Sequence, residues 1–438
     1  MKYLHKLAFA LIAVVNLSTA NQAFGQAYVA TNHWLQQAPG YPAGTTWEQV
    51  YSQWVSSDEV NEDFFVTGKH HIIGQEDCKK AAVGIRCSFA ADHDLPCEML
   101  GGTLTNSTPL PGVYAAGDSK QVRVKKFLTY LLAHVSVQSV SRDSVPIKIS
   151  AETLTPGAFA LFMPGDHRNH TITVKSVDST GYLRGIYGTD EQSQEKDKNT
   201  NYIFERGGIP DSVEPSQPGK DGFRKWRHYS EVKNPEDEPG YDSVQQYSSN
   251  FREPGESYGH AIERHVWQYA PSTADKLRHM EDDLCHQVKD VRTVIVGAGQ
   301  RLLEKRRNSI SGNPNYEFQG AEYDENSTPS RDSQIKSDFD TLQDFLNSLG
   351  NDPQYRKFVK DKERRFEDCS IVYGSGFSDR MTLADFEEAM GRPSSQDETL
   401  IGVVSNNPNS SLKEKWGVNF TGGSSDETAY SGPIASRH

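Results

Sequence analysis

The spacing of hydrophobic residues predicts helices and strands in separate groups along the chain. Residues 77–91 carry Cys78, Ala82, Ile85 and Phe89 at the spacing of one helix face. Short apolar runs flanked by turn residues are instead typical of strands. The predicted helices are 46–55, 77–91, 122–137, 258–269, 273–308, 332–349, 353–366 and 382–390, and the predicted strands are 158–163, 171–177 and 182–187.

These elements predict an α+β fold followed by a mostly helical C-terminal region. The stretch after the strands is rich in Asp, Glu, Lys, Ser, Pro and Gly, which is typical of a linker. The expected organisation is a signal peptide at 1–25, an α+β domain at 26–195, a polar connector at 196–257, a helical region at 258–391 and a loop or tail at 392–438.

The first residues have the pattern of a secretory signal peptide. Lys2 and Lys6 precede the apolar run 7–15, and small residues lead to a cleavage site near Gly25. A buried N-terminal helix is the alternative. The pattern predicts export to a periplasm or out of the cell.

Composition narrows the functional classes. Hydrophobic residues make up 35% of the chain and charged residues 24%, so a packed core with long polar loops is expected. The net charge of −13 argues against binding to nucleic-acid phosphates. No apolar run has the roughly 18 residues of a membrane-spanning helix, so no membrane span is expected in the mature protein.

Five cysteines in an oxidising compartment predict two disulfides and one thiol outside them. Cys285 and Cys369 both lie in the helical C-terminal half, and Cys87 and Cys97 are close in sequence. These positions favour the pairs Cys285–Cys369 and Cys87–Cys97, although the sequence alone leaves other pairings open. Cys78 is then the remaining thiol.

Cys78 and His170 are the candidate catalytic residues. Cys78 begins a predicted helix, where backbone N–H groups and the helix dipole favour a thiolate. His170 opens a predicted strand and could serve as the base that activates the thiol. The alternatives are a small core residue for Cys78 and a structural histidine for His170. The pair His167 and His170 could be half of a metal site, but no matching ligands stand out, and no metal or cofactor is expected.

The order of these residues resembles the NlpC-type papain-like cell-wall hydrolases. In that family an Asp-Cys dipeptide starts a helix, and a His starts a strand after a Pro-Gly-Asp segment. The matching pieces are Asp77-Cys78, residues 155–162 and residues 170–174. Lys79-Lys80 and Ala158 depart from the family pattern. The resemblance implies a papain-like fold over about residues 70–190, a Cys78 nucleophile, a His170 base and peptidoglycan stem peptides as substrate.

Such sites also need a polar residue that orients the imidazole. A hairpin with its turn at 178–181 would bring His170 level with positions near 187–189, so Tyr187, Thr189 and the following Asp190 are the positional candidates. Neither Tyr187 nor Thr189 is a usual orienting residue. The sequence therefore supports two hypotheses: an exported cysteine peptidase or amidase, or a non-catalytic cell-envelope or interaction protein that retains the fold. A protein partner remains open for the helical C-terminal region.

Overall fold

The fold is seen in a computed structural model that describes most of the chain between residues 25 and 383. The described residues are 25–61, 64–65, 78–163, 170–188, 203–208, 215, 217–288, 307–308, 329–349, 353, 356, 366, 369–373 and 379–383; for 170, 203–206, 329–336, 370–373 and 379–381 the description covers the backbone alone. The predicted signal peptide and tail lie outside these residues.

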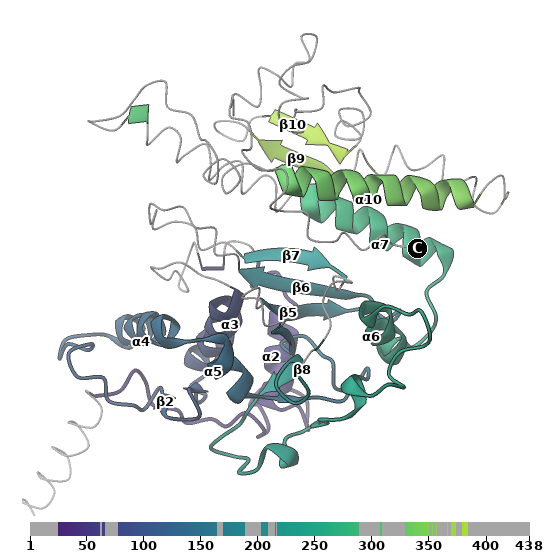
Figure 1. Ribbon diagram of the computed structural model, residues 1–438. Helices are drawn as coiled ribbons and strands as arrows, with labels where there is room; N and C mark the ends of the chain where they lie inside the picture. Colours follow the sequence, from purple (N-terminus) through teal and green to yellow (C-terminus); the bar gives the residue numbers. More distant parts are fainter. Residues whose placement is uncertain are drawn as a thin grey trace, which may run out of the picture.

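The N-terminal part consists of helices packed on one face of a sheet (Figure 1). The first of them has a capping box, in which Thr46 Oγ1 accepts from the Gln49 N–H and Gln49 Oε1 accepts from the Thr46 N–H. The helices and short strands of this part are α2 (Trp47–Val55), α3 (Cys78–Asp92), β1 (Glu98–Met99), β2 (Leu104–Thr105), α4 (Lys120–His134) and α5 (Val137–Arg142).

The sheet has six strands in the order β3-β8-β4-β5-β6-β7, and every described pairing is antiparallel. The predicted hairpin around the turn at 178–181 is confirmed, with Thr173 paired to Ile186. The fold class is therefore α+β. The strands are β3 (Ser144–Pro146), β4 (Phe159–Phe162), β5 (His170–Val177), β6 (Leu183–Gly188), β7 (Ile203–Gly207) and β8 (Gly222–Trp226).

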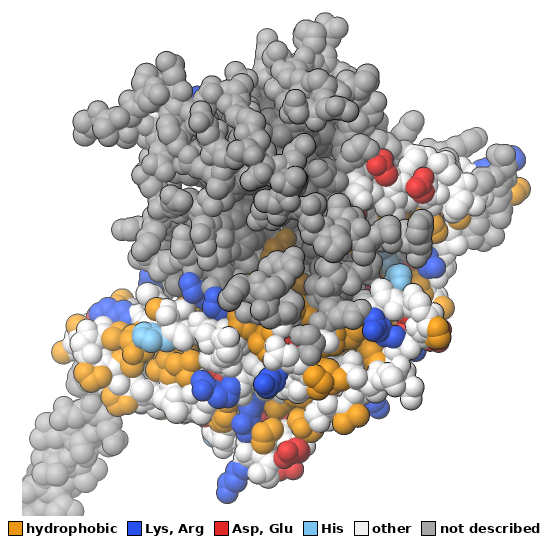
Figure 2. Space-filling model, in the orientation of Figure 1, with side chains coloured by type: hydrophobic (Ala, Val, Ile, Leu, Met, Phe, Trp, Pro, Cys, Tyr) orange, Lys and Arg blue, Asp and Glu red, His pale blue; other side chains and the backbone are white. Residues whose placement is uncertain are grey.

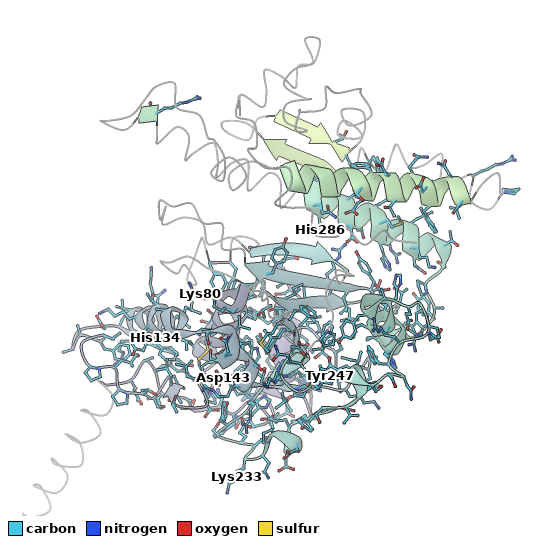
Figure 3. All side chains as sticks on the ribbon, in the orientation of Figure 1. Lys80, His134, Asp143, Lys233, Tyr247 and His286 are labelled. Atoms are coloured by element: carbon cyan, nitrogen blue, oxygen red, sulfur yellow. A yellow bond between two sulfur atoms is a disulfide. The ribbon has the colours of Figure 1, made fainter. Side chains whose placement is uncertain are left out.

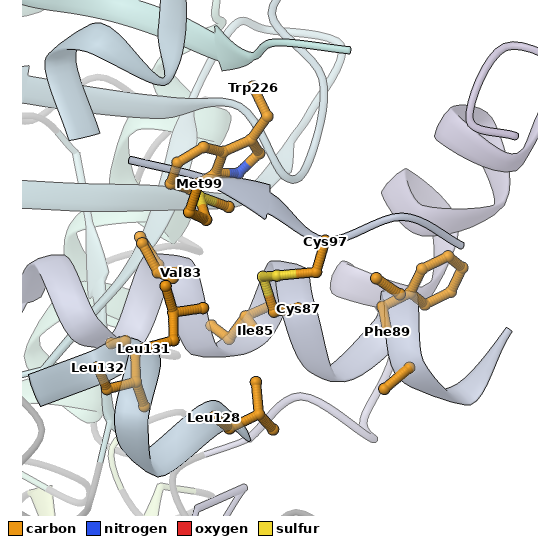
Figure 4. Packing of buried hydrophobic residues seen from close by; sticks show 14 of the residues in the cluster. Val83, Ile85, Cys87, Phe89, Cys97, Met99, Leu128, Leu131, Leu132 and Trp226 are labelled. Carbon is orange, nitrogen blue, oxygen red and sulfur yellow. A yellow bond between two sulfur atoms is a disulfide. The ribbon is translucent and has the colours of Figure 1, made fainter. Parts of the chain in front are cut away.

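Each face of the sheet has its own hydrophobic core. Because side chains alternate along a strand, β4 sends Phe159 and Leu161 to the helices α2–α5 and Ala160 and Phe162 to the opposite face. α3 packs against β5 and β6 on the first face, and all of its residues from Ala81 to Ala91 are buried. Figure 4 shows α3 side chains packed between α4 and Trp226 of β8. The second face is covered by α6 (Tyr258–Val266).

The C-terminal elements lie beside the last strand of the sheet. α7 (Thr273–His286) contacts β7, and α10 (Pro329–Ser348) packs on α7 (Figure 1). A small hairpin follows, formed by β9 (Ser370–Tyr373) and β10 (Asp379–Thr382). Both predicted disulfides are confirmed: Cys87–Cys97 joins α3 to β1, and Cys285–Cys369 joins α7 to the residue before β9.

One expectation about the domain organisation is wrong. The region 196–257 is no connector, because it supplies β7 and β8, and β8 lies between β3 and β4 inside the sheet. It also contains the 3₁₀ turns η2 (Pro235–Asp237) and η3 (Gln245–Tyr247). The region 258–391 includes the β9–β10 hairpin beside its helices, and the helix predicted from Thr382 lies mostly outside the described residues. The helix predicted for 353–366 lies mostly outside the described residues.

Candidate functional site

The candidate nucleophile lies at the open end of the most buried helix. Cys78 is the first residue of α3, and Cys78, Lys79 and Lys80 are half-buried, whereas every residue from Ala81 to Ala91 is buried. The other four cysteines are in disulfides, and Cys78 is not. Figure 3 shows Lys80 at the end of α3 beside the sheet.

The candidate base lies on a strand that α3 contacts. His170 is the first residue of β5 and pairs with Phe162 of β4. Because α3 packs against β5, the fold brings together the two elements that carry Cys78 and His170. Only the backbone of His170 is among the described atoms, so the pairing of its ring with the thiol stays a prediction.

The face of β5 that lies against α3 is lined by polar side chains. Thr171 and Thr173 are buried there, opposite Leu161 and Phe159 of β4, and Thr171 Oγ1 is a buried hydroxyl with no hydrogen-bond partner. Lys175 donates from Nζ to the Ser57 carbonyl at 2.6 Å and to the Val60 carbonyl. This lysine therefore fastens the chain after α2 to the sheet.

The candidate orienting residues are described only in part. Tyr187 is on β6, half-buried, and packs against the core on the α6 side of the sheet. Thr189 and Asp190 lie outside the described residues, as do Asp77 and His167. The identity of a third site residue stays open.

A second polar cluster, which the sequence did not reveal, surrounds the middle of α3. We call Glu48, Arg86, His228 and Glu238 the buried charge network. Arg86 Nη1 lies 2.7 Å from Glu48 Oε2, and the same Glu48 oxygen lies 3.2 Å from His228 Nε2. On its other side, His228 Nδ1 lies 2.7 Å from Glu238 Oε2, and the His228 backbone N–H donates to Glu238 Oε1. The Arg86 guanidinium also stacks on Trp34, 3.2 Å from the ring centroid.

The partners in this network determine which of its members are charged. Burial favours neutral His228, but hydrogen bonds to Glu238 and Glu48 outweigh burial and raise the His228 pKa to about 9. Burial alone would raise the Glu48 pKa, yet Arg86 and His228 lower it well below its usual range. At neutral pH the network therefore holds paired charges on α2, α3 and the segment after β8.

This network is closed to substrates. The side chains of Arg86, His228 and Glu238 are 3%, 4% and 1% exposed, and each charge already faces an opposite one. It can hold elements in place but offers no group to a reacting molecule. The sequence signal that could have revealed it is Arg86 itself, a cation between apolar residues in the most buried helix.

Further observations limit other kinds of site. Within the described ranges, no group of three or more His, Cys, Asp or Glu residues is arranged to hold a metal ion. No described helix is long and apolar enough to cross a bilayer. On the face shown in Figure 2, the described Lys and Arg side chains lie at separate points among apolar ones, unlike the continuous basic surface of many nucleic-acid-binding proteins.

Comparisons with family models, with curated proteins and with solved structures find no match for this chain.

Proposed function

We propose that the protein is a cysteine hydrolase that cleaves an amide bond, with Cys78 as nucleophile. The observation that carries this proposal is the position of Cys78: a half-buried thiol outside any disulfide, on the first residue of a helix that packs against the strand beginning at His170. The start of a helix favours the thiolate and supplies N–H groups for an oxyanion.

The roles follow from the chemistry of thiol hydrolases. His170 would take the proton from the Cys78 thiol, and the thiolate would attack the carbonyl carbon of the substrate amide. Backbone N–H groups in the first turn of α3 would stabilise the oxyanion. His170 would then return the proton to the leaving amine, and water would hydrolyse the thioester.

The substrate class and location come from the resemblance and from the N-terminal pattern. The resemblance to NlpC-type hydrolases points to peptidoglycan stem peptides, and the pattern of residues 1–25 points to an exported protein. The two disulfides are compatible with an oxidising compartment. No metal or cofactor is needed for this reaction.

A second candidate function is a non-catalytic envelope or interaction protein, and the faces of β5 favour it. Thr171, Thr173 and Lys175 line the face toward α3, whereas Ile172 and Val174 pack in the core on the α6 side. In the alternation of a strand, position 170 belongs with 172 and 174. The first residue of a strand can depart from this alternation. Experiment therefore has to separate the hydrolase from the interaction protein.

The test is hydrolysis of purified peptidoglycan by the wild type, Cys78→Ser and His170→Ala. Serine is far harder to ionise than cysteine, so Cys78→Ser should abolish turnover. Removing the base should lower turnover by about 10² or more. His134→Ala, an exposed histidine on α4, is the matched control and should keep wild-type activity.

Alkylation of the thiol gives a second readout that needs no substrate. Iodoacetamide should modify Cys78 well below pH 8 in the wild type, and His170→Ala should move this reaction to higher pH. Full activity of Cys78→Ser would disprove the mechanism. A Cys78 that reacts only at the pH of an ordinary thiol, in a protein without hydrolytic activity, would favour the interaction protein.

A further inference from the structure

Helix α7 lies against β7, the strand at one edge of the sheet. A small set of ionisable side chains connects α7 to the turn between β5 and β6. β7 is the outermost strand on its side, and α7 lies along it (Figure 1). We call Asp178 and Tyr182, from the β5–β6 turn, together with His279 and Asp283 of α7, the edge latch. They connect two regions that are about a hundred residues apart in the sequence.

The contacts within the edge latch are close and specific. His279 Nε2 lies 2.9 Å from Asp178 Oδ2. The His279 ring stacks on Tyr182, with centroids 3.9 Å apart and planes inclined by 8°. The Tyr182 hydroxyl donates to Asp283 Oδ1. Each side chain of α7 in the latch therefore has a partner on the sheet.

A glycine on β7 permits this approach. A methyl group at Gly207 would overlap Asp283 Oδ1 and the Tyr182 hydroxyl. Gly207 has no left-handed backbone torsion, so alanine is allowed at this position by the backbone itself. Substitution of Gly207 by alanine therefore disturbs the latch without straining β7.

The charge state of the edge latch depends on protons. Burial and the nearby Asp338 of α10 raise the Asp283 pKa to about 6, against the lowering effects of the Tyr182 hydrogen bond and of the nearby His286 and Arg184. Asp178 has its pKa lowered, because hydrogen bonds from Thr180 and His279 outweigh its burial.

Other charged groups lie around Asp283 and its partners in the edge latch. Arg184 pairs with Asp282 at 3.1 Å, Glu263 lies near Tyr182, and Asp275 lies near His279. Protonation of Asp283 removes its repulsion from Asp338. This change favours contact between α7 and the sheet as the pH falls.

We propose that α7 docks on the edge of the sheet in a proton-dependent manner, closed in mildly acidic solution and more often open at neutral pH. The disulfide Cys285–Cys369 makes β9 and β10 follow α7 when it moves. Opening would uncover β7, whose backbone groups on that side have no neighbouring strand in the sheet. This device does not depend on the proposed hydrolase activity.

Hydrogen exchange of the full-length protein, corrected for intrinsic exchange rates, tests the proposal at pH 5.0 and pH 7.5. If the Asp283 pKa falls from about 6 to its ordinary value on opening, the docking equilibrium should weaken about tenfold between these two pH values. The readout is the protection of peptides that cover β7 and α7. Peptides covering β4 in the middle of the sheet should keep the same protection and serve as the internal reference.

Three variants make the test specific. Asp283→Asn keeps the shape and stays uncharged, so protection of β7 and α7 should no longer depend on pH. Gly207→Ala should lower this protection about tenfold or more at both pH values. Asp282→Asn, the matched control on the neighbouring residue, should keep the wild-type pH dependence.

Equal protection at both pH values in the wild type would overturn the proposal, and so would an unchanged pH dependence in Asp283→Asn. Loss of β4 protection in Gly207→Ala would mean that this variant unfolds. The pH dependence of β7 and α7 protection in Asp283→Asn would then be the deciding result.

Discussion

The middle of α3 and its N-terminal end differ in what their polar groups are able to do. Around Arg86, the buried charge network pairs every charge with an opposite one, and the disulfide Cys87–Cys97 fixes the same stretch of helix. At Cys78 the helix is half-buried, has no disulfide and carries two adjacent lysines. The polar groups of the first region pair with one another inside the fold, whereas Cys78 in the second is a half-buried thiol outside the disulfides.

This difference shows that burial of polar residues is a poor guide to a reactive site in this protein. The buried charge network has large pKa shifts, with His228 raised and Glu48 lowered, yet both shifts come from partners that already satisfy the charge. The proposed hydrolase chemistry is at the N-terminal end of α3 instead. The middle of α3 and its N-terminal end can therefore be compared by the stability of variants.

The largest effect is expected when the network loses its arginine. Arg86→Met removes the cation that lies 2.7 Å from Glu48 and the stacking on Trp34, so the free energy of unfolding should fall by about 4 kcal/mol. Urea unfolding measures this loss. Lys79→Met, at the N-terminal end of the same helix, should change the free energy of unfolding by no more than about 0.5 kcal/mol. Equal losses in the two variants would remove the distinction between the two regions of α3.

The next effect concerns pH. The His228 pKa is raised from 6.5 to about 9 in the folded protein. The contribution of protonated His228 to the free energy of unfolding is therefore fully present below pH 6.5 and is lost as the pH rises through 9. The loss should be about 3 kcal/mol over this window. Urea unfolding of the wild type and of His228→Gln, between pH 6 and pH 9.5, measures it. If the difference in free energy of unfolding between the wild type and His228→Gln did not shrink with rising pH, the raised pKa of His228 would be contradicted.

The smallest effect on stability is expected at the thiol. Cys78→Ser should change the free energy of unfolding by less than about 1 kcal/mol, because the residue is half-buried and outside the disulfides. Replacing both Cys87 and Cys97 by serine should instead cost about 3 kcal/mol. Thermal melts of the two proteins give the comparison. A large loss in Cys78→Ser would assign the thiol to the core instead of to a site.

The periodic elements of the N-terminal part could be predicted from the sequence. The helix that begins near Cys78 and the hairpin around 178–181 follow from apolar spacing and turn residues, and the structure has both. β8 was missed because it is five residues long, contains Arg224 and lies in a stretch rich in Gly and Pro. Arg224 is buried in the sheet only because Ser144 and nearby carbonyl oxygens accept its N–H groups. Such partners cannot be read from local spacing.

The candidate site was predicted unevenly for the same reason. Cys78 could be selected because cysteine parity and a helix start are local signals. Glu48 and His228 are 180 residues apart in the sequence, and no periodicity predicts that they meet. The edge latch is equally non-local, since His279 meets Asp178 across 101 residues. Contacts of this kind depend on how the sheet is ordered, which the short strands do not disclose.

The bond between Cys285 and Cys369 has a consequence for proteolysis. The two cysteines enclose a stretch with a sequence separation of 84 residues. A protease that cuts once anywhere between them produces two polypeptides that are still covalently joined. Such a nicked protein should run as one band on a denaturing gel without reductant and as two bands with it. The chain can therefore be cleaved in this stretch and still keep α7 attached to the residues that follow the cut.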